Sequence, residues 1–316
     1  MSEKKTIAVI GATGAQGGGL VRALLADAGG GFAARAVTRK TGSDKARALA
    51  AAGAEVVAAD ADDPASLERA FKGAHGVFVV TNFWEHFSAE RELKQASAMA
   101  RATKAAGVKH VVWSTLEDTR LDFPLDDPRL KTLQGKYKVP HFDAKGEADA
   151  VFRAEAAPTS YLMAAFYWEN FIFFGQGPRK MADGSVVLGL PLGGGKLPGI
   201  AAEDIGKCAY GIFKRGPEAA GQRFGVAGDV LSGPEYAAAF SRHLGVPVSF
   251  YDMPFDDYRA LGVPGADDMG NMYEHHAILG EAFRRNRSPE LARALNPALQ
   301  NFDTWLRANA SRIPIG

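Results

Sequence analysis

Hydrophobic and polar positions in the first half of the chain follow a strand pattern and a helix pattern in turn. Short apolar runs rich in β-branched residues, which are typical of buried parallel strands, stand at Thr6–Ile10, Phe32–Thr38, Glu55–Ala59, Val77–Thr81 and His110–Ser114. Segments with helical spacing lie between them, at Gly18–Ala28, Ser43–Ala52, the stretch opened by Asp63-Pro64, and Glu90–Ala106. This alternation predicts an α/β fold, a doubly wound parallel sheet with helices on both faces.

After Pro158 the pattern changes, and glycine and proline interrupt shorter periodic segments. Tyr161–Ala165 continues the strand pattern. Further helices are predicted at Ala202–Lys214, Gly233–His243, Phe255–Leu261, Asp267–Leu279 and Pro289–Leu295. We therefore expect residues 1–158 to form a first α/β domain. Residues 159–316 should add the remaining strands and a smaller C-terminal α/β lobe on the substrate or partner side, interleaved with the first domain.

Composition and charge narrow the class of protein. The chain of 316 residues has 37 Lys+Arg against 36 Asp+Glu, and this near balance argues against direct nucleic-acid binding. The single cysteine, Cys208, excludes an intrachain disulfide, and no zinc-binding spacing occurs, so we expect no metal. Residues Met1–Lys5 lack the apolar core of a signal peptide, and no apolar run approaches the roughly 20 residues of a membrane helix. The sequence predicts a soluble, cytoplasmic protein.

A glycine-rich turn follows the first predicted strand directly. Its residues have the spacing G-x-x-G-x-x-G and are Gly11, Ala12, Thr13, Gly14, Ala15, Gln16 and Gly17. Glycine lets the backbone approach a pyrophosphate closely, and the next helix offers free N–H groups and the positive end of its dipole. We interpret the turn as a Rossmann-type dinucleotide site. The alternative is a tight strand–helix turn without a ligand.

Basic residues end the second predicted strand, where sites that prefer NAD usually carry an acidic residue. Arg39 and Lys40 stand there, and a guanidinium can pair with a 2′-phosphate through two hydrogen bonds. The sequence therefore predicts NADP(H) as the cofactor, although a solvated Arg-Lys pair is the alternative. Asp60, at the end of the third strand, can accept a hydrogen bond from the adenine amino group.

The motifs GATGAQGG, VTRK and AADADD, with VTNFWE, HFDAKGE and YWENF further along, resemble the NmrA-like family, an atypical branch of the short-chain dehydrogenases/reductases. The resemblance runs over almost the whole chain and includes residues 221–225 and 264–268. It implies that the glycine turn binds the pyrophosphate and that Arg39 binds the 2′-phosphate. The further cofactor contacts that it implies are Ala61, Thr81, Asn82, Phe83, Lys94, Lys145, Tyr167, Trp168, Glu169 and Asn170.

The chain departs from the parent superfamily at the catalytic position. Active members carry Tyr-x-x-x-Lys on one helical face, so that the lysine lowers the pKa of the tyrosine for proton transfer. Here the residue four before Lys145 is His141. That histidine either donates the proton instead or packs locally at the start of a helix. Ser114 stands where the superfamily has a catalytic hydroxyl, and hydrogen bonding within a turn is its alternative role.

Two functions follow from the resemblance and this departure. The first is a regulator that responds to NADPH and NADP⁺ by changing its association with a second copy or a protein partner, with little or no dehydrogenase activity. The second is an NAD(P)H-dependent reductase of a quinone-like or small carbonyl substrate. The missing tyrosine favours the regulator.

Overall fold

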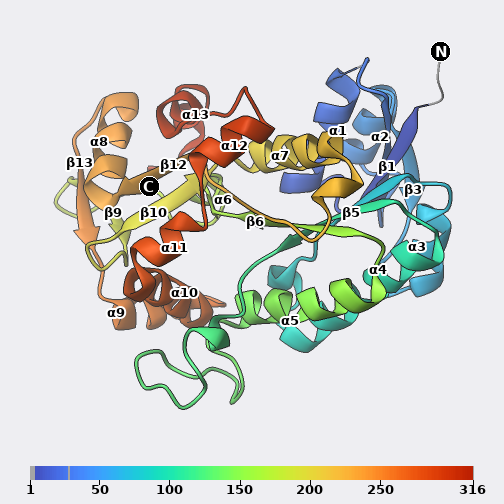
Figure 1. The fold of residues 1–316 in the computed structure, drawn as a ribbon. Coiled ribbons are helices and arrows are strands. Elements are labelled where there is room, and N and C mark those ends of the chain that lie inside the picture. Colours follow the sequence, from blue (N-terminus) through green and yellow to red (C-terminus); the bar gives the residue numbers. More distant parts are fainter. Residues whose placement is uncertain (1–3, 28, 316) are drawn as a thin grey trace.

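A seven-stranded parallel sheet forms the centre of the computed structural model, which describes residues 4–27 and 29–315 (Figure 1). Its strands are, in spatial order, β11 (Arg223–Val226), β6 (Thr159–Ala164), β5 (His110–Thr115), β4 (Gly76–Val79), β1 (Lys5–Val9), β2 (Phe32–Thr38) and β3 (Glu55–Ala58). Every neighbouring pair in this sheet is parallel. The prediction of a doubly wound Rossmann-type sheet is confirmed, and β6 and β11 come from the part of the chain beyond residue 158.

Helices cover both faces of this sheet (Figure 1). One face carries α1 (Ala15–Ala26), α2 (Asp44–Ala51) and α7 (Ala202–Arg215). The other carries α3 (Pro64–Phe71), α4 (Ala89–Ala105) and α5 (Pro140–Glu155). Among residues 4–27 and 29–315, every helix is too short or too polar to span a lipid bilayer.

Helix α1 begins at Ala15, three residues before the predicted start at Gly18, so that prediction was wrong. The glycines lie inside the helix because α1 packs backbone to backbone on its neighbours. A Cβ on Gly17 would lie 2.4 Å from the carbonyl oxygen of Gly11, and a Cβ on Gly19 would lie 2.5 Å from that of Glu203 in α7. Small residues here allow the close approach rather than ending the helix. The predicted end, Ala28, lies outside the described residues.

The C-terminal lobe contains two small sheets that the sequence pattern did not predict. One orders β12 (Asp229–Ser232), β10 (Lys196–Ile200) and β7 (Phe166–Tyr167), and the other orders β13 (Val248–Asp252), β9 (Val186–Leu190) and β8 (Arg179–Lys180). The helices of the lobe are α6 (Asn170–Phe173), α8 (Gly233–Leu244), α9 (Phe255–Arg259), α10 (Ala266–Leu279), α11 (Glu281–Arg285) and α13 (Phe302–Asn309). Helix α12 (Pro289–Leu295) instead packs on α7 and β11 of the main sheet. The predicted helices all occur, with bounds shifted by a few residues at most.

Candidate functional site

The topology brings the predicted cofactor residues to one edge of the main sheet. β1 is flanked by β2 on one side and by β4 on the other, so the strand order reverses there. In open α/β sheets this reversal forms a crevice at the carboxyl ends of the strands. Gly11, Arg39, Asp60 and Thr81 follow the carboxyl ends of β1, β2, β3 and β4 within two residues.

The glycine turn has the geometry of an anion cradle. Gly11 has φ +65°, a backbone conformation that favours glycine, and the space beside Gly17 is filled by the backbone of the turn itself. Gly14 caps α1 without a side-chain hydrogen bond, whereas Ser43, Asp63 and Ser88 cap α2, α3 and α4 with their side chains. The first N–H groups of α1 are therefore left for an anion, which fits a dinucleotide pyrophosphate.

Gln16 connects the glycine turn to the second lobe. Its side chain is buried, and the amide nitrogen donates a hydrogen bond to the hydroxyl of Tyr167 in β7. The other amide atom, Oε1, is buried and has no hydrogen-bond partner among the described residues. Burial raises the pKa of Tyr167 to about 12, so this hydroxyl stays protonated at neutral pH. The pair joins the predicted pyrophosphate and nicotinamide ends of the site.

Arg39 is already bound by a carboxylate. Its guanidinium donates to Glu85 through Nη1 to Oε1 at 2.5 Å and through Nη2 to Oε2 at 3.1 Å. The hydrogen bond from Arg39 lowers the pKa of Glu85 below its ordinary value. Both side chains are about half exposed, at 55% and 41%, so the pair lies at the surface of the crevice. Lys40 beside it is exposed, and Asp60 is half-buried.

Lys145 lies inside the protein in a closed set of polar contacts. Its Nζ is 2.7 Å from Oε1 of Glu92, which is fully buried on α4, and it donates to the Thr81 hydroxyl at 2.5 Å. The Thr81 hydroxyl in turn donates to the same Glu92 oxygen at 2.6 Å. The lysine charge is therefore balanced by an adjacent carboxylate instead of standing alone beside His141.

His141 forms a buried pair with Asp268 of α10. The ring Nδ1 lies 2.6 Å from Oδ1 of Asp268, and the backbone N–H of His141 donates to Oδ2 at 3.1 Å. The two side chains are only 8% and 5% exposed. Because an ionised carboxylate can only accept, Nδ1 carries the ring proton and Nε2 is the nitrogen left for chemistry. His141 and Lys145 lie one helical turn apart on α5.

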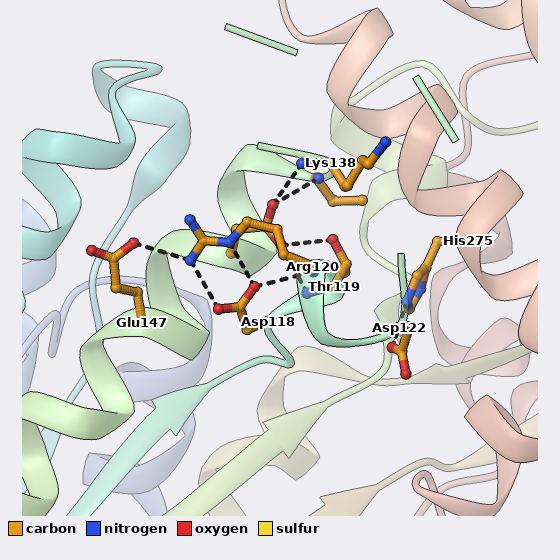
Figure 2. Close-up of polar contacts among 9 residues, drawn as sticks. Asp118, Thr119, Arg120, Asp122, Lys138, Glu147 and His275 are labelled. Carbon is orange, nitrogen blue, oxygen red and sulfur yellow. Dashed lines mark hydrogen bonds and ion pairs between the residues drawn. The ribbon is translucent and has the colours of Figure 1, made fainter. Parts of the chain in front are cut away.

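A polar stripe on α10 fixes the segment that leads into α5. Asp268, Asn271 and His275 follow the i, i+3, i+7 spacing of one helical face. Asn271 donates to the backbone carbonyls of Lys131 and Lys138, at 2.7 and 2.6 Å. His275 contacts Asp122 through Nε2 at 3.0 Å, as Figure 2 shows. The stripe thus joins the second lobe to His141 and to the loop before it.

Helix α5 also binds the segment that precedes it, at Thr119 and Lys138. The buried carboxylate of Asp143 accepts from the backbone and hydroxyl of Thr119, at 2.8 and 2.6 Å, and from the backbone N–H of Lys138 at 2.7 Å. Arg120 adds ion pairs with Asp118 and with Glu147 of α5 (Figure 2). These contacts fix the first turn of α5, which carries His141.

The remaining predicted residues are divided between the crevice and the interior. Asn82 and Lys94 are exposed and Ala61 is half-buried, whereas Phe83 is buried and its ring lies 6.0 Å from that of His141. Residues of β5 and of the second lobe are less accessible. Ser114 in β5 is buried, and Trp168 is buried in the aromatic core of the second lobe. The carboxylate of Glu169 accepts hydrogen bonds from the backbone N–H of Ala202 and from the indole N–H of Trp305. Asn170 begins α6 and is half-buried.

The sequence analysis did not identify three carboxylates of the site, those of Glu85, Glu92 and Asp268. Glu92 had a detectable signal, because it shares one helical face with Ala96, Met99 and Thr103, which are all buried. A charged residue on such a face predicts an internal partner. The contacts of Glu85 and Asp268 join residues 46 and 127 positions apart, and no local pattern indicates them.

Comparison with known proteins agrees with this fold. The sequence profile of the NmrA-like family matches residues 3–305. An NmrA-like family domain-containing oxidoreductase of Aspergillus hancockii is 29% identical over 315 residues, covering 93% of this chain and 91% of the relative. The NAD(P)H azoreductase of Xenophilus azovorans is 30% identical over 275 residues, covering 84% and 86%. The solved structure of NmrA, a negative transcriptional regulator, in complex with NADP has a TM-score of 0.77 at 24% identity, covering 97% and 95%. This chain therefore belongs to the NmrA-like family.

Proposed function

We propose that this protein is an NADPH-dependent reductase that acts on a quinone-like or small carbonyl substrate. The observation that carries the proposal is the buried pair of His141 and Asp268, one helical turn before Lys145. The short-chain dehydrogenase/reductase pattern has a proton-donating tyrosine at that position, and a hydrogen-bonded imidazole can take the same role. The 30% identity to an NAD(P)H azoreductase over most of the chain supports a reductase.

The crevice fits a dinucleotide, and Arg39 is the basis for proposing NADP(H) over NAD(H). The turn from Gly11 to Gly17 offers backbone N–H groups at an uncapped helix start, which suits the pyrophosphate. Arg39 can bind a 2′-phosphate with two parallel hydrogen bonds, and exposed Lys40 adds a second positive charge. Replacing Arg39 by alanine should weaken binding of NADPH by about 1.5–3 kcal/mol and leave NADH nearly unchanged in titration calorimetry. Equal losses for both nucleotides would show that Arg39 does not recognise the phosphate.

The residues around His141 are arranged for proton transfer. NADPH held by the glycine turn and Arg39 would supply the hydride for reduction of the acceptor carbon. The imidazole of His141 would donate a proton from Nε2 to the acceptor oxygen, while Asp268 holds the ring in place through Nδ1. The ring of Trp84 lies 4.8 Å from the imidazole and shields the pair from water, which strengthens the contact with Asp268. Lys145, balanced by Glu92, contributes a fixed dipole instead of a free charge.

Steady-state oxidation of NADPH with a panel of quinones and small carbonyl compounds tests this proposal. His141→Gln and Asp268→Asn should each lower kcat by about 100-fold or more, the lower range for general acid catalysis, and leave the affinity for NADPH nearly unchanged. The matched control is His243→Gln, because His243 pairs with Asp303 at 2.9 Å on α8, on the surface of the second lobe. Turnover that survives His141→Gln would contradict the proposed role, and cofactor binding without turnover of any acceptor would contradict the reductase.

A second candidate function is an NADP(H)-responsive regulator, and the Arg39–Glu85 pair supports it. A nucleotide phosphate that binds Nη1 and Nη2 of Arg39 must separate this pair, so its binding changes contacts in the crevice. Such a change could alter association with a second copy or a regulatory protein through differential affinity for the two states. Sedimentation velocity with and without NADPH tests this candidate, and an unchanged sedimentation coefficient would argue against self-association as the response.

A further inference from the structure

Glu85 binds the Arg39 guanidinium through both of its terminal nitrogens, Nη1 and Nη2. The two contacts run from Nη1 to Oε1 at 2.5 Å and from Nη2 to Oε2 at 3.1 Å, which is the fork geometry that carboxylates and phosphates share. A 2′-phosphate bound to Arg39 in the same two-point manner needs these same N–H groups. Glu85 and a 2′-phosphate bound to Nη1 and Nη2 therefore exclude each other on Arg39.

The neighbouring charges make Glu85 the carboxylate that has to move. Asp60 and Asp62 lie close to Arg39 as well, but Asp60 accepts the backbone N–H of Asp62 at 3.0 Å, and Asp62 is bound by Arg91 at 2.7 Å. Among the described residues, Glu85 forms its ion pair with Arg39, and Arg91 is a second positive charge near it. Losing Arg39 leaves Glu85 free to turn toward solvent, to which 41% of its side chain is already exposed. An exposed pair of this kind exchanges partners at little cost, because water solvates both charges.

The segment that carries Glu85 also covers His141. Glu85 ends the short 3₁₀ turn Phe83–Glu85, whose Trp84 ring lies 4.8 Å from the imidazole. Two residues later Phe87 has φ +52°, a left-handed conformation that costs conformational energy for a bulky residue. The Arg39–Glu85 pair is thus one of the contacts that hold a strained segment over the proposed proton donor.

We propose that Glu85 is a specificity-determining residue: it holds Arg39 in the free protein, the 2′-phosphate of NADP(H) displaces it, and NAD(H) leaves it in place. Displacement releases the segment from Phe83 to Phe87 from the adenosine side of the crevice. NADP(H) and NAD(H) thereby leave this segment in different states. The inference rests on the proposed cofactor preference and extends it to a residue that the family resemblance does not assign.

Calorimetric titration with two adenosine fragments tests the competition without any turnover. The probes are 2′,5′-ADP, which carries the 2′-phosphate, and 5′-AMP, which lacks it. Glu85→Gln should tighten binding of 2′,5′-ADP about 2- to 5-fold, the range for removing an exposed ion pair, and leave 5′-AMP unchanged. Glu90→Gln is the matched control, because Glu90 pairs with Lys136 at 2.8 Å on the exposed surface of α4.

A double-mutant comparison separates competition from a general charge effect. In an Arg39→Ala background, Glu85→Gln should no longer change the affinity for 2′,5′-ADP. A gain that persists without Arg39, or a gain shared by 5′-AMP, would overturn the inference, as would Glu85→Gln binding no tighter than wild type. If 2′,5′-ADP does not bind the wild-type protein better than 5′-AMP, the proposed cofactor preference fails first. If the fragments behave as expected and no acceptor is reduced, the inference survives and the reductase does not.

The release of the segment has its own readout in Trp84. This ring is 37% exposed, whereas Trp113, Trp168 and Trp305 are buried, so acrylamide quenching of tryptophan fluorescence reports mainly on Trp84. NADP⁺ should change the quenching of the wild-type protein, and NAD⁺ should change it less. Trp84→Phe should remove the difference. Equal responses to the two nucleotides would contradict the release.

Discussion

Replacing Lys145 by methionine should destabilise the protein strongly, because it leaves the carboxylate of Glu92 buried without its cation. Glu92 is fully buried, its Oε1 keeps the hydroxyl of Thr81 as a donor, and its Oε2 has no partner in the part of the chain that the structure describes. Breaking a buried ion pair by removing one partner costs about 3–5 kcal/mol. That is a large share of a typical unfolding free energy of about 5–15 kcal/mol.

The double substitution Glu92→Met/Lys145→Met should recover most of this loss, since it removes both charges and fills a similar volume. The expected remainder is about 1 kcal/mol, for the Thr81 hydroxyl that loses its acceptor. Urea unfolding followed by circular dichroism measures each variant, with Lys136→Met as the control from an exposed pair that should cost less than about 1 kcal/mol. A Lys145→Met variant as stable as this control, or a double variant no more stable than the single one, would refute the reasoning.

Two further predictions concern the glycine turn and a buried histidine. Gly17→Ala should weaken NADP⁺ binding at least tenfold in calorimetry, because its Cβ would lie 2.4 Å from the Gly11 carbonyl oxygen and the turn must shift. Gly18→Ala should have a smaller effect, because its Cβ would lie 3.2 Å from the end of the Arg22 side chain and 3.3 Å from the Ala12 carbonyl oxygen; equal losses would argue against a cause specific to Gly17. Burial lowers the pKa of His110 to about 4, so the folded state binds this proton more weakly than the unfolded state. The contribution of His110 to the free energy of unfolding is complete above its unfolded pKa of about 6.5 and falls by about 3 kcal/mol as the pH drops to 4. His110→Gln should remove this loss, so the free energy of unfolding of the variant should depend less on pH between about 6.5 and 4.

The parts of the fold that local patterns encode were predicted from the sequence. The strands of the first half follow β-branched runs, and the cap of α3 at Asp63 was visible as an Asp-Pro pair before a helix. The predicted start of α1 at Gly18 was wrong because residues 15–17 were assigned to the glycine turn, whereas they form the first turn of the helix. The small sheets of the second lobe escaped prediction because their strands are as short as two residues and lie between glycines and prolines.

The partners of the site residues escaped prediction for a different reason. Arg39 and His141 were each identified by type and position, but the carboxylate that each one meets comes from a distant part of the chain. The pairing is fixed by how α10 and the turn after β4 dock, which depends on tertiary packing. The sequence shows that a basic side chain is present at each position. Only the structure shows which carboxylate lies beside it and balances its charge.

The three basic side chains of the site fall into two kinds once their carboxylates are known. Lys145 and His141 meet carboxylates that are 0% and 5% exposed, so separating either pair would leave a buried charge, and both pairs stay fixed while ligands come and go. Arg39 meets a carboxylate that is 41% exposed and can be solvated when it is displaced. The crevice therefore combines an exchangeable ion pair where the nucleotide phosphate is proposed to bind with permanent pairs where proton transfer is proposed. Substitutions at Glu85 should change which nucleotide binds, and substitutions at Glu92 or Asp268 should change stability and turnover.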